Sequence, residues 1–162
     1  AANFVLYVDG YDTYTSAIPD WARSTLAATP RTTLYSPEIL EHAQTHDPVW
    51  NAAQLEMVLT GKMHNYLRMY WGKRLLAWHE DPATAFALAL RLNNRYSLDG
   101  RDPNSFAGVA WCFGRHDRPW PRTPLFGMVR SMTPEGLARK FDIQDYTRRI
   151  GLLYNQAIRE AP

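Results

Sequence analysis

The chain has 162 residues, 46% of them apolar, and a formal net charge of +2 at neutral pH. This length fits one domain with a sizeable core, and no apolar run reaches the roughly 18 residues that a membrane-spanning helix requires. No basic stretch followed by an apolar run opens the chain, so no secretory signal is expected, and the single cysteine, Cys112, favours a reducing, cytoplasmic location without an internal disulfide.

The first 35 residues are predicted to form an extended arm and a short helix. Residues 4–8 are rich in β-branched and aromatic side chains and locally resemble a strand. No second strand is predicted, and a single strand is not stable alone, so the segment is interpreted as an extended arm or the end of a helix that begins upstream. Pro19 and Asp20 predict a short helix that ends at about Ala28.

Residues 36–162 are predicted to form a helical body. The predicted helices mostly follow a residue that can cap them, often with proline at the first helical position, as in Ser36-Pro37 and Asp47-Pro48. They cover about 37–46, 48–60, 64–78, 82–96 and 106–113, and two more begin at about 134 and 143. Asp-Gly and Asp-Pro steps predict a loop over 97–104, and prolines predict an exposed loop over 116–124. The fold predicted is an all-α helical bundle in one domain, residues 1–162.

Three tryptophans lie on two successive predicted helices. Trp71 and Trp78 are seven residues apart, which places them on one face of a helix, about 10 Å apart along its axis. Trp50 lies on the preceding helix, which a turn at Gly61 and Lys62 would fold back alongside, so the three indoles could form a row. Such a row could be a core of large aromatic side chains or a relay for single electrons toward a buried redox cofactor, and the residues alone favour the core.

Polar side chains flank this predicted row. Arg68, on the helix of Trp71, has apolar neighbours, and a mostly buried arginine needs a carboxylate partner. Asp99, in the turn-rich loop, is the candidate partner, and the pair could either pin the loop or flank a cofactor ring. Asn93 and Asn94 lie near the end of the helix predicted over 82–96, just before this loop. Their amides could cap that helix or hydrogen-bond a heteroaromatic ring.

Arginine and tryptophan gather near residue 116. The members of this cluster are Trp111, Arg115, His116, Asp117, Arg118 and Trp120. Exposed tryptophan beside arginine suits base stacking and phosphate binding, although the rim of a protein–protein contact is similar. Residues 1–49 carry a net charge of −4 and the remainder +6, and a basic surface suits an anionic partner.

The histidines do not predict a metal site. The five histidines lack ligating neighbours, and the i,i+4 spacing of His42 and His46 is weak on its own. No metal is therefore expected.

Several longer motifs follow one another along the chain. They are Asp47-Pro48-Val49-Trp50-Asn51-Ala52-Ala53-Gln54-Leu55-Glu56, Gly61-Lys62-Met63-His64, Arg68-Met69-Tyr70-Trp71-Gly72-Lys73, Leu92-Asn93-Asn94-Arg95-Tyr96, Leu98-Asp99-Gly100-Arg101-Asp102-Pro103-Asn104 and His116-Asp117-Arg118-Pro119-Trp120. In these motifs the chain resembles the class II cyclobutane pyrimidine dimer photolyases over nearly its whole length. The resemblance implies the C-terminal part of their all-helical, FAD-binding domain. We expect the N-terminal α/β domain, with any antenna chromophore site, to lie outside this chain.

The resemblance also implies roles for residues near the flavin. Trp50, Trp71 and Trp78 would carry electrons to the flavin during its light-driven reduction, with Trp71 nearest the flavin and Trp78 on the surface side. The residues implied to bind the cofactor are Arg68, Asn93, Asp99 and Asp102. Among these, Arg68 and Asp99 would form an ion pair beside the ring, and Asn93 would face flavin N5 and favour the reduced cofactor.

A DNA-contacting face is implied as well. Met69 and Trp111 would form a wall of the lesion pocket, so Met69 counts with Asn93 and the three tryptophans as catalytic. The residues implied to contact DNA are Trp111, Arg115, Asp117, Arg118 and Trp120, the last three on a loop that enters the gap left by flipped-out bases. Met128 and Ser131 depart from the family pattern, which has lysine and tyrosine there, and we expect weaker DNA contacts at these positions.

The implied function is light-driven DNA repair by a deoxyribodipyrimidine photo-lyase. Excited reduced FAD donates an electron to a flipped-out cyclobutane pyrimidine dimer in double-stranded DNA, the ring splits and the electron returns. The full-length protein is expected to be a monomer. Two alternatives stay open: a cryptochrome-like blue-light receptor without repair activity, and a cofactor-free helical nucleic-acid-binding remnant. Because part of the cofactor cradle would lie upstream, an open cleft lined by Trp50, Met69 and Trp111 is also expected.

Overall fold

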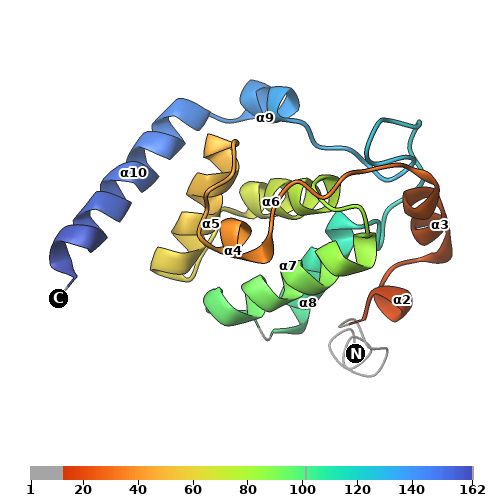
Figure 1. The fold of residues 1–162 in the computed structure, drawn as a ribbon, viewed down its shortest axis with the longest axis horizontal. Helices are drawn as coiled ribbons and strands as arrows, with labels where there is room; N and C mark the ends of the chain where they lie inside the picture. Colours follow the sequence, from red (N-terminus) through yellow and green to blue (C-terminus); the bar gives the residue numbers. More distant parts are fainter. Residues whose placement is uncertain (1–12, 101, 162) are drawn as a thin grey trace.

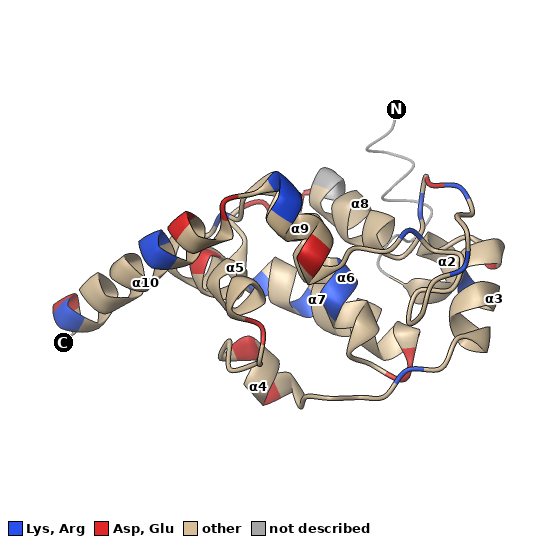
Figure 2. Ribbon diagram, turned by 90° about the horizontal axis from the view of Figure 1, so that it is seen from above, with Lys and Arg blue, Asp and Glu red and all other residues tan. Residues whose placement is uncertain are grey.

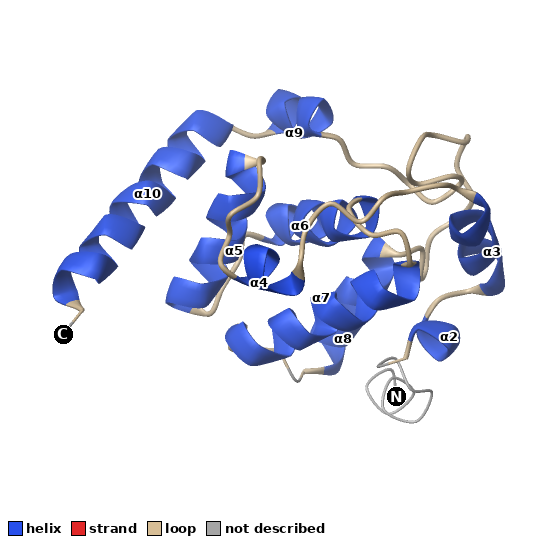
Figure 3. Ribbon diagram, viewed as in Figure 1, coloured by secondary structure: helices blue, strands red, loops and turns tan. Residues whose placement is uncertain are grey.

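The computed structural model describes residues 13–100 and 102–161. These residues form helices and loops without a strand (Figure 1, Figure 3). The helices are α2 (Tyr14–Ala17), α3 (Asp20–Ala28), α4 (Pro37–Glu41), α5 (Pro48–Thr60), α6 (Asn65–Ala77), α7 (Pro82–Tyr96), α8 (Pro103–Cys112), α9 (Pro134–Lys140) and α10 (Ile143–Glu160). The predicted all-α fold is confirmed, while the prediction for residues 4–8 lies outside the described residues.

Proline and a capping side chain start many of these helices. Pro37, Pro48, Pro82 and Pro134 are the first residues of α4, α5, α7 and α9. Just before each proline, a Ser, Asp or Thr side chain accepts a backbone N–H from the first turn. Proline has a φ suited to the helix and lacks an N–H that would go unsatisfied there. The predicted starts of these four helices are therefore confirmed.

Two predicted boundaries are wrong. α4 ends at Glu41 and not near His46, because the backbone of Ala43 has a left-handed φ of 57° that a helix cannot continue. The predicted loop over 97–104 ends at Asp102, whose carbonyl accepts the N–H groups of Ser105 and Phe106. α8 therefore begins at Pro103, from the same Asp-Pro signal that starts α5 and α7.

α6 occupies the centre of the fold. α5, α7 and α8 all pack against it, and α10 lies along the outer side of α5 (Figure 1). The α6–α8 contact is close because Gly72 lacks a side chain, and a Cβ there would lie 2.6 Å from Sγ of Cys112. No helix in the described part of the chain has the length and apolarity needed to cross a lipid bilayer. Most side chains of α6 are thus buried by neighbouring helices, including those of Leu67, Trp71 and Leu75.

Candidate functional site

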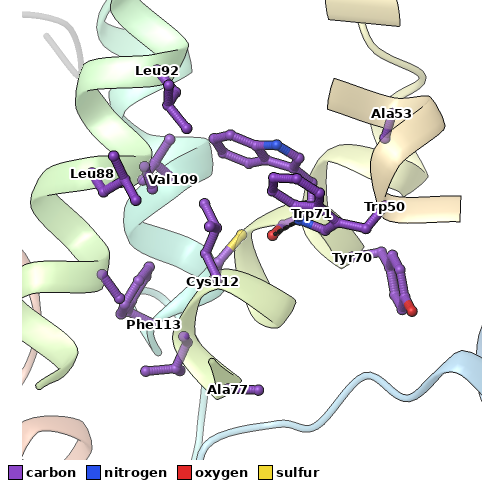
Figure 4. Close-up of a cluster of buried hydrophobic side chains, with 14 of the residues drawn as sticks. Trp50, Ala53, Tyr70, Trp71, Ala77, Leu88, Leu92, Val109, Cys112 and Phe113 are labelled. Atoms are coloured by element: carbon purple, nitrogen blue, oxygen red, sulfur yellow. Dashed lines mark hydrogen bonds between the residues drawn. The ribbon is translucent and has the colours of Figure 1, made fainter. Parts of the chain in front are cut away.

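Three indoles form a row in the interior, which we call the tryptophan row. Trp50 and Trp71 are stacked, with ring centroids 6.3 Å apart and planes 4° from parallel; Figure 4 shows these two rings face to face. Trp50 also meets Trp78 edge-on, with centroids 5.4 Å apart. Each side chain is at most 1% exposed. Trp50 is thus the middle member, and the predicted arrangement in a row is confirmed.

Hydrogen bonds hold the first two indoles in place. Nε1 of Trp50 donates to the backbone carbonyl of Trp71 at 3.0 Å, and Nε1 of Trp71 donates to Oε1 of Gln54 at 2.9 Å. The amide nitrogen of Gln54 in turn donates to the carbonyl of Glu41. A buried indole N–H needs such an acceptor. Both acceptors are neutral, so neither of these indole N–H groups is bonded to an ionised group.

The predicted Arg68–Asp99 ion pair is present at the Trp71 end of the row. Nη2 of Arg68 lies 3.5 Å from Oδ1 of Asp99, and Arg68 precedes Trp71 by one turn of α6. The Arg68 side chain is 18% exposed and that of Asp99 56%. A hydrogen bond from Ser97 and the charge of Arg68 hold the pKa of the Asp99 carboxyl below its usual value. The carboxylate therefore stays ionised at neutral pH.

The surroundings of this pair fit the FAD that the resemblance implies. Arg68, Leu98 and Asp99 line an open hollow of about 380 Å³. Nε of Arg68 and Oδ1 of Asn94 are buried and have no hydrogen-bond partner among the described residues. A flavin ring carries both hydrogen-bond donors and acceptors, which could satisfy such atoms. Arg68 and Asp99, which line the hollow, are the residues that would hold it.

Two further predicted cofactor residues have other surroundings. Asn93 is 1% exposed, and its amide nitrogen donates to Oγ of Ser105 at 2.5 Å. Asp102 is exposed just before α8. Their contact with a cofactor stays a prediction.

Met69 and Trp111 line a second hollow, of about 360 Å³, which we call the Met69–Trp111 hollow. Its other walls include the basic residues Arg130, Arg139 and Lys140, and also Ser131. The expectation that Trp50 lines the same open cleft is wrong. Trp50 is fully buried because Trp71 and Trp78 cover its ring. The open surface is therefore formed by α6, α8, α9 and the segment before α9.

Trp120 contacts several residues of the loop that follows α8. Its backbone N–H donates to Met128, and its indole N–H donates to Oδ1 of Asp117 at 3.1 Å. The guanidinium carbons of Arg118 and Arg130 lie 4.2 and 5.1 Å from the centroid of its ring. Arg115 is half-buried at the start of this loop. The structure thus brings Asp117, Arg118 and Trp120 together, and Figure 2 shows basic residues on the loop and on α9.

Sequence reasoning missed two buried polar side chains, Gln54 beside the row and Lys73 elsewhere on α6. Gln54 follows Trp50 by one helical turn, and this spacing could have marked it as a partner for an indole. Lys73 is 1% exposed, and its Nζ has no hydrogen-bond partner among the described residues. Burial lowers the pKa of Lys73 to about 8. Nothing in the local sequence distinguishes this lysine from a surface one.

Among the described residues, no three His, Cys, Asp or Glu side chains group in a way that could hold a metal ion.

No family model matches the chain. Over 151 residues it is 58% identical to a protein of Methanothermobacter thermautotrophicus named deoxyribodipyrimidine photo-lyase, a match that covers 91% of this chain and 34% of the relative.

Two eukaryotic proteins of the same name are also similar to the chain. The one from Oryza sativa is 45% identical over 161 residues, and the one from Potorous tridactylus is 46% identical over 154 residues. These matches cover 97% and 93% of this chain but 32% and 29% of the relatives. The chain therefore spans about a third of the length of the curated relatives it matches.

Proposed function

From this similarity to part of the photo-lyases, we propose that the chain is a segment of the FAD-binding helical domain of a class II photolyase. The parent activity is light-driven splitting of cyclobutane pyrimidine dimers in DNA. The observation that carries the proposal is the tryptophan row, three buried indoles in ring contact that end one helical turn from Arg68. Excited reduced FAD supplies the electron that opens the cyclobutane ring.

The tryptophan row provides a path for single electrons. Neighbouring rings are in contact, so an electron lost by Trp71 can be replaced from Trp50, and one lost by Trp50 from Trp78. Neutral hydrogen-bond partners and the absence of exposed edges limit solvent reorganisation during each transfer. Trp71 is the member closest in sequence to the ion pair, which supports its position at the cofactor end.

The Arg68–Asp99 ion pair would bind and orient the flavin ring. Arg68 has one nitrogen on Asp99 and a second, Nε, that is buried and free for an acceptor atom of a bound ring. Ionised Asp99 keeps the guanidinium in position. These residues move no proton. They would orient a bound flavin ring.

The Met69–Trp111 hollow and the Trp120 loop suit a flipped-out lesion and its DNA strand. Trp111 is 37% exposed, so one face of its ring is available for stacking on a base. Arg130, Arg139 and Lys140 around the hollow can neutralise phosphates. Binding through these residues would weaken as salt concentration rises.

A chimera tests the proposed function. The chain would replace its matching segment in the Methanothermobacter relative, and repair of a dimer-containing duplex would be measured in blue light and in darkness. Repair in light alone supports the proposal. A chimera that retains flavin and does not split dimers would favour a cryptochrome-like receptor, and a folded chimera without a flavin absorbance band would favour a cofactor-free remnant.

The same chimera tests the role of the row. Trp50→Phe keeps an aromatic ring in the core and removes the middle electron donor. We expect light-driven flavin reduction to slow at least about tenfold, with repair retained once the flavin is reduced chemically. Trp21→Phe is the matched control, because Trp21 is half-buried on α3, outside the row. Equal effects of the two variants would contradict the assignment.

A further inference from the structure

The tryptophan row does not end at Trp78. The ring of Tyr35 meets Trp78 edge-on, with centroids 5.2 Å apart, and the imidazole of His46 lies 5.7 Å from Trp78. Tyr35 and His46 are themselves stacked at 5.9 Å, and the Tyr35 hydroxyl is hydrogen-bonded to Nδ1 of His46. A phenol with a base on its hydroxyl therefore contacts the outer member of the row.

The direction of the hydrogen bond follows from a second contact. The backbone N–H of His46 donates to the Tyr35 hydroxyl oxygen at 3.0 Å. Because this donor already occupies the phenol oxygen, the phenol proton is best placed on the line to Nδ1, with the other ring nitrogen of His46 carrying the imidazole hydrogen. Tyr35 is then the donor and Nδ1 of His46 the acceptor.

The segment that carries Tyr35 is tied to the end of α6. The guanidinium of Arg31, 7% exposed, donates to the carbonyls of Leu26, His79 and Leu125. The N–H of Leu34 donates to the carbonyl of Trp78 itself at 3.0 Å. These bonds hold the phenol against the indole, although 43 residues of chain separate them.

The charges around Trp78 favour electron donation by a group that also loses a proton. The guanidinium carbon of Arg74 lies 5.5 Å from the Trp78 ring centroid, so positive charge on this indole is disfavoured. A tyrosine that loses an electron and its proton together becomes a neutral radical, so no positive charge stays on the phenol. The positive charge moves to His46, which is exposed to water.

We propose that Tyr35 and His46 form the outer terminus of the electron path, a donor of one electron paired with an acceptor of one proton. One electron passes from Tyr35 to the oxidised indole of Trp78, and the phenol proton passes to Nδ1 of His46. The products are reduced Trp78, a neutral tyrosyl radical and protonated His46. A soluble one-electron reductant, such as a thiol, returns the electron, and His46 returns the proton. The proposal rests on the proposed function for the source of oxidised Trp78.

The test uses an added chemical oxidant to oxidise Trp78. The result therefore does not depend on flavin binding. Ruthenium(III) tris(bipyridine), generated by a laser flash with a cobalt(III) quencher, oxidises the full 162-residue chain, and transient absorption with electron paramagnetic resonance distinguishes tyrosyl from tryptophanyl radicals. We expect a tyrosyl radical to form as the tryptophanyl signal decays. In Tyr35→Phe the tyrosyl signal should be lost and the tryptophanyl radical should last at least about ten times longer.

Three further variants separate the proposal from its rivals. His46→Phe keeps a ring beside Trp78 and removes the base, so formation of the tyrosyl radical should slow at least about tenfold. Trp78→Phe should also abolish transfer to Tyr35, and a tyrosyl radical that persists there would overturn the order of transfer. Tyr154→Phe, at an exposed site on α10, is the control and should change nothing. Circular dichroism checks that each variant is folded.

The outcome is independent of the photolyase assignment. A tyrosyl signal that survives Tyr35→Phe, or that disappears only in Tyr154→Phe, would overturn the proposed terminus even if the chimera repairs DNA. Conversely, a chimera without flavin leaves the hop from Tyr35 to Trp78 measurable in the isolated chain.

Discussion

Five of the six tryptophans of this protein occupy two contrasting regions. In the tryptophan row, Trp50 and Trp71 are enclosed and hydrogen-bonded to a carbonyl and an amide, both neutral. In the outer region, Trp111 is 37% exposed and Trp120 lies beside Asp117 and two guanidinium groups. The first region suits movement of electrons between rings, and the second suits contact with a polyanion. The same side chain is therefore suited to different chemistry according to its surroundings.

Truncating one tryptophan in each region gives the largest expected difference. Trp50→Ala should lower the free energy of unfolding by about 3–5 kcal/mol, because it leaves a cavity between Trp71 and Trp78. Trp111→Ala, on the open side, should change it by less than about 1 kcal/mol. Urea unfolding followed by circular dichroism measures both. Similar losses for the two variants would contradict the contrast between the regions.

Lys73 tests how strictly the interior excludes charge. Its pKa is lowered from 10.5 to about 8, so the ammonium destabilises the fold by up to about 3 kcal/mol below pH 8. Lys73→Met should therefore raise stability at pH 7. Between pH 8 and 9 the stability of the unmodified chain should increase, because the folded state releases the proton before the unfolded state does.

Above pH 9 a second buried group opposes this rise. Burial raises the pKa of the Cys112 thiol from 9.0 to about 11, so the unfolded state releases that proton first, and the contribution of this thiol to stability decreases as the pH rises. Urea unfolding at pH 7, 8 and 9 checks the window where Lys73 dominates. A flat profile for the unmodified chain would show that the ammonium has a partner in solution.

Gln54 tests the hydrogen bonding of the row. Gln54→Leu removes the acceptor of the Trp71 indole N–H and should cost about 1–3 kcal/mol, since a buried donor is left unsatisfied. Gln54→Glu keeps an acceptor oxygen and is the comparison variant, although it adds a buried charge. Fluorescence of the row during urea unfolding measures the change. A neutral effect of Gln54→Leu would mean that water replaces the amide.

Asp99 should give the smallest effect. Its side chain is 56% exposed, so Asp99→Asn should lower the free energy of unfolding by less than about 1 kcal/mol. The lowered pKa of this carboxyl means that its contribution is present above about pH 4 and is lost as the pH falls through the folded pKa. Unfolding curves at pH 7 and pH 3 should therefore differ less for the variant than for the unmodified chain.

The sequence alone predicted most of the helices and the spacing of two indoles in the site. Capping residues followed by proline set the starts of four helices, because these signals act through the nearest backbone N–H groups. The seven-residue spacing of Trp71 and Trp78 is a property of one helix and needed no tertiary information. The end of α4 was mispredicted, because a left-handed residue such as Ala43 has no local signal.

Tertiary structure alone decided which side chains are buried and which distant ones meet. Gln54 and Lys73 became interior groups because α6 lies between α5, α7 and α8. Tyr35 and His46 contact Trp78 because hydrogen bonds from Arg31 and Leu34 hold a loop against the end of α6. Contacts across so many residues depend on packing of the whole chain, whereas helix caps depend on three or four neighbouring residues.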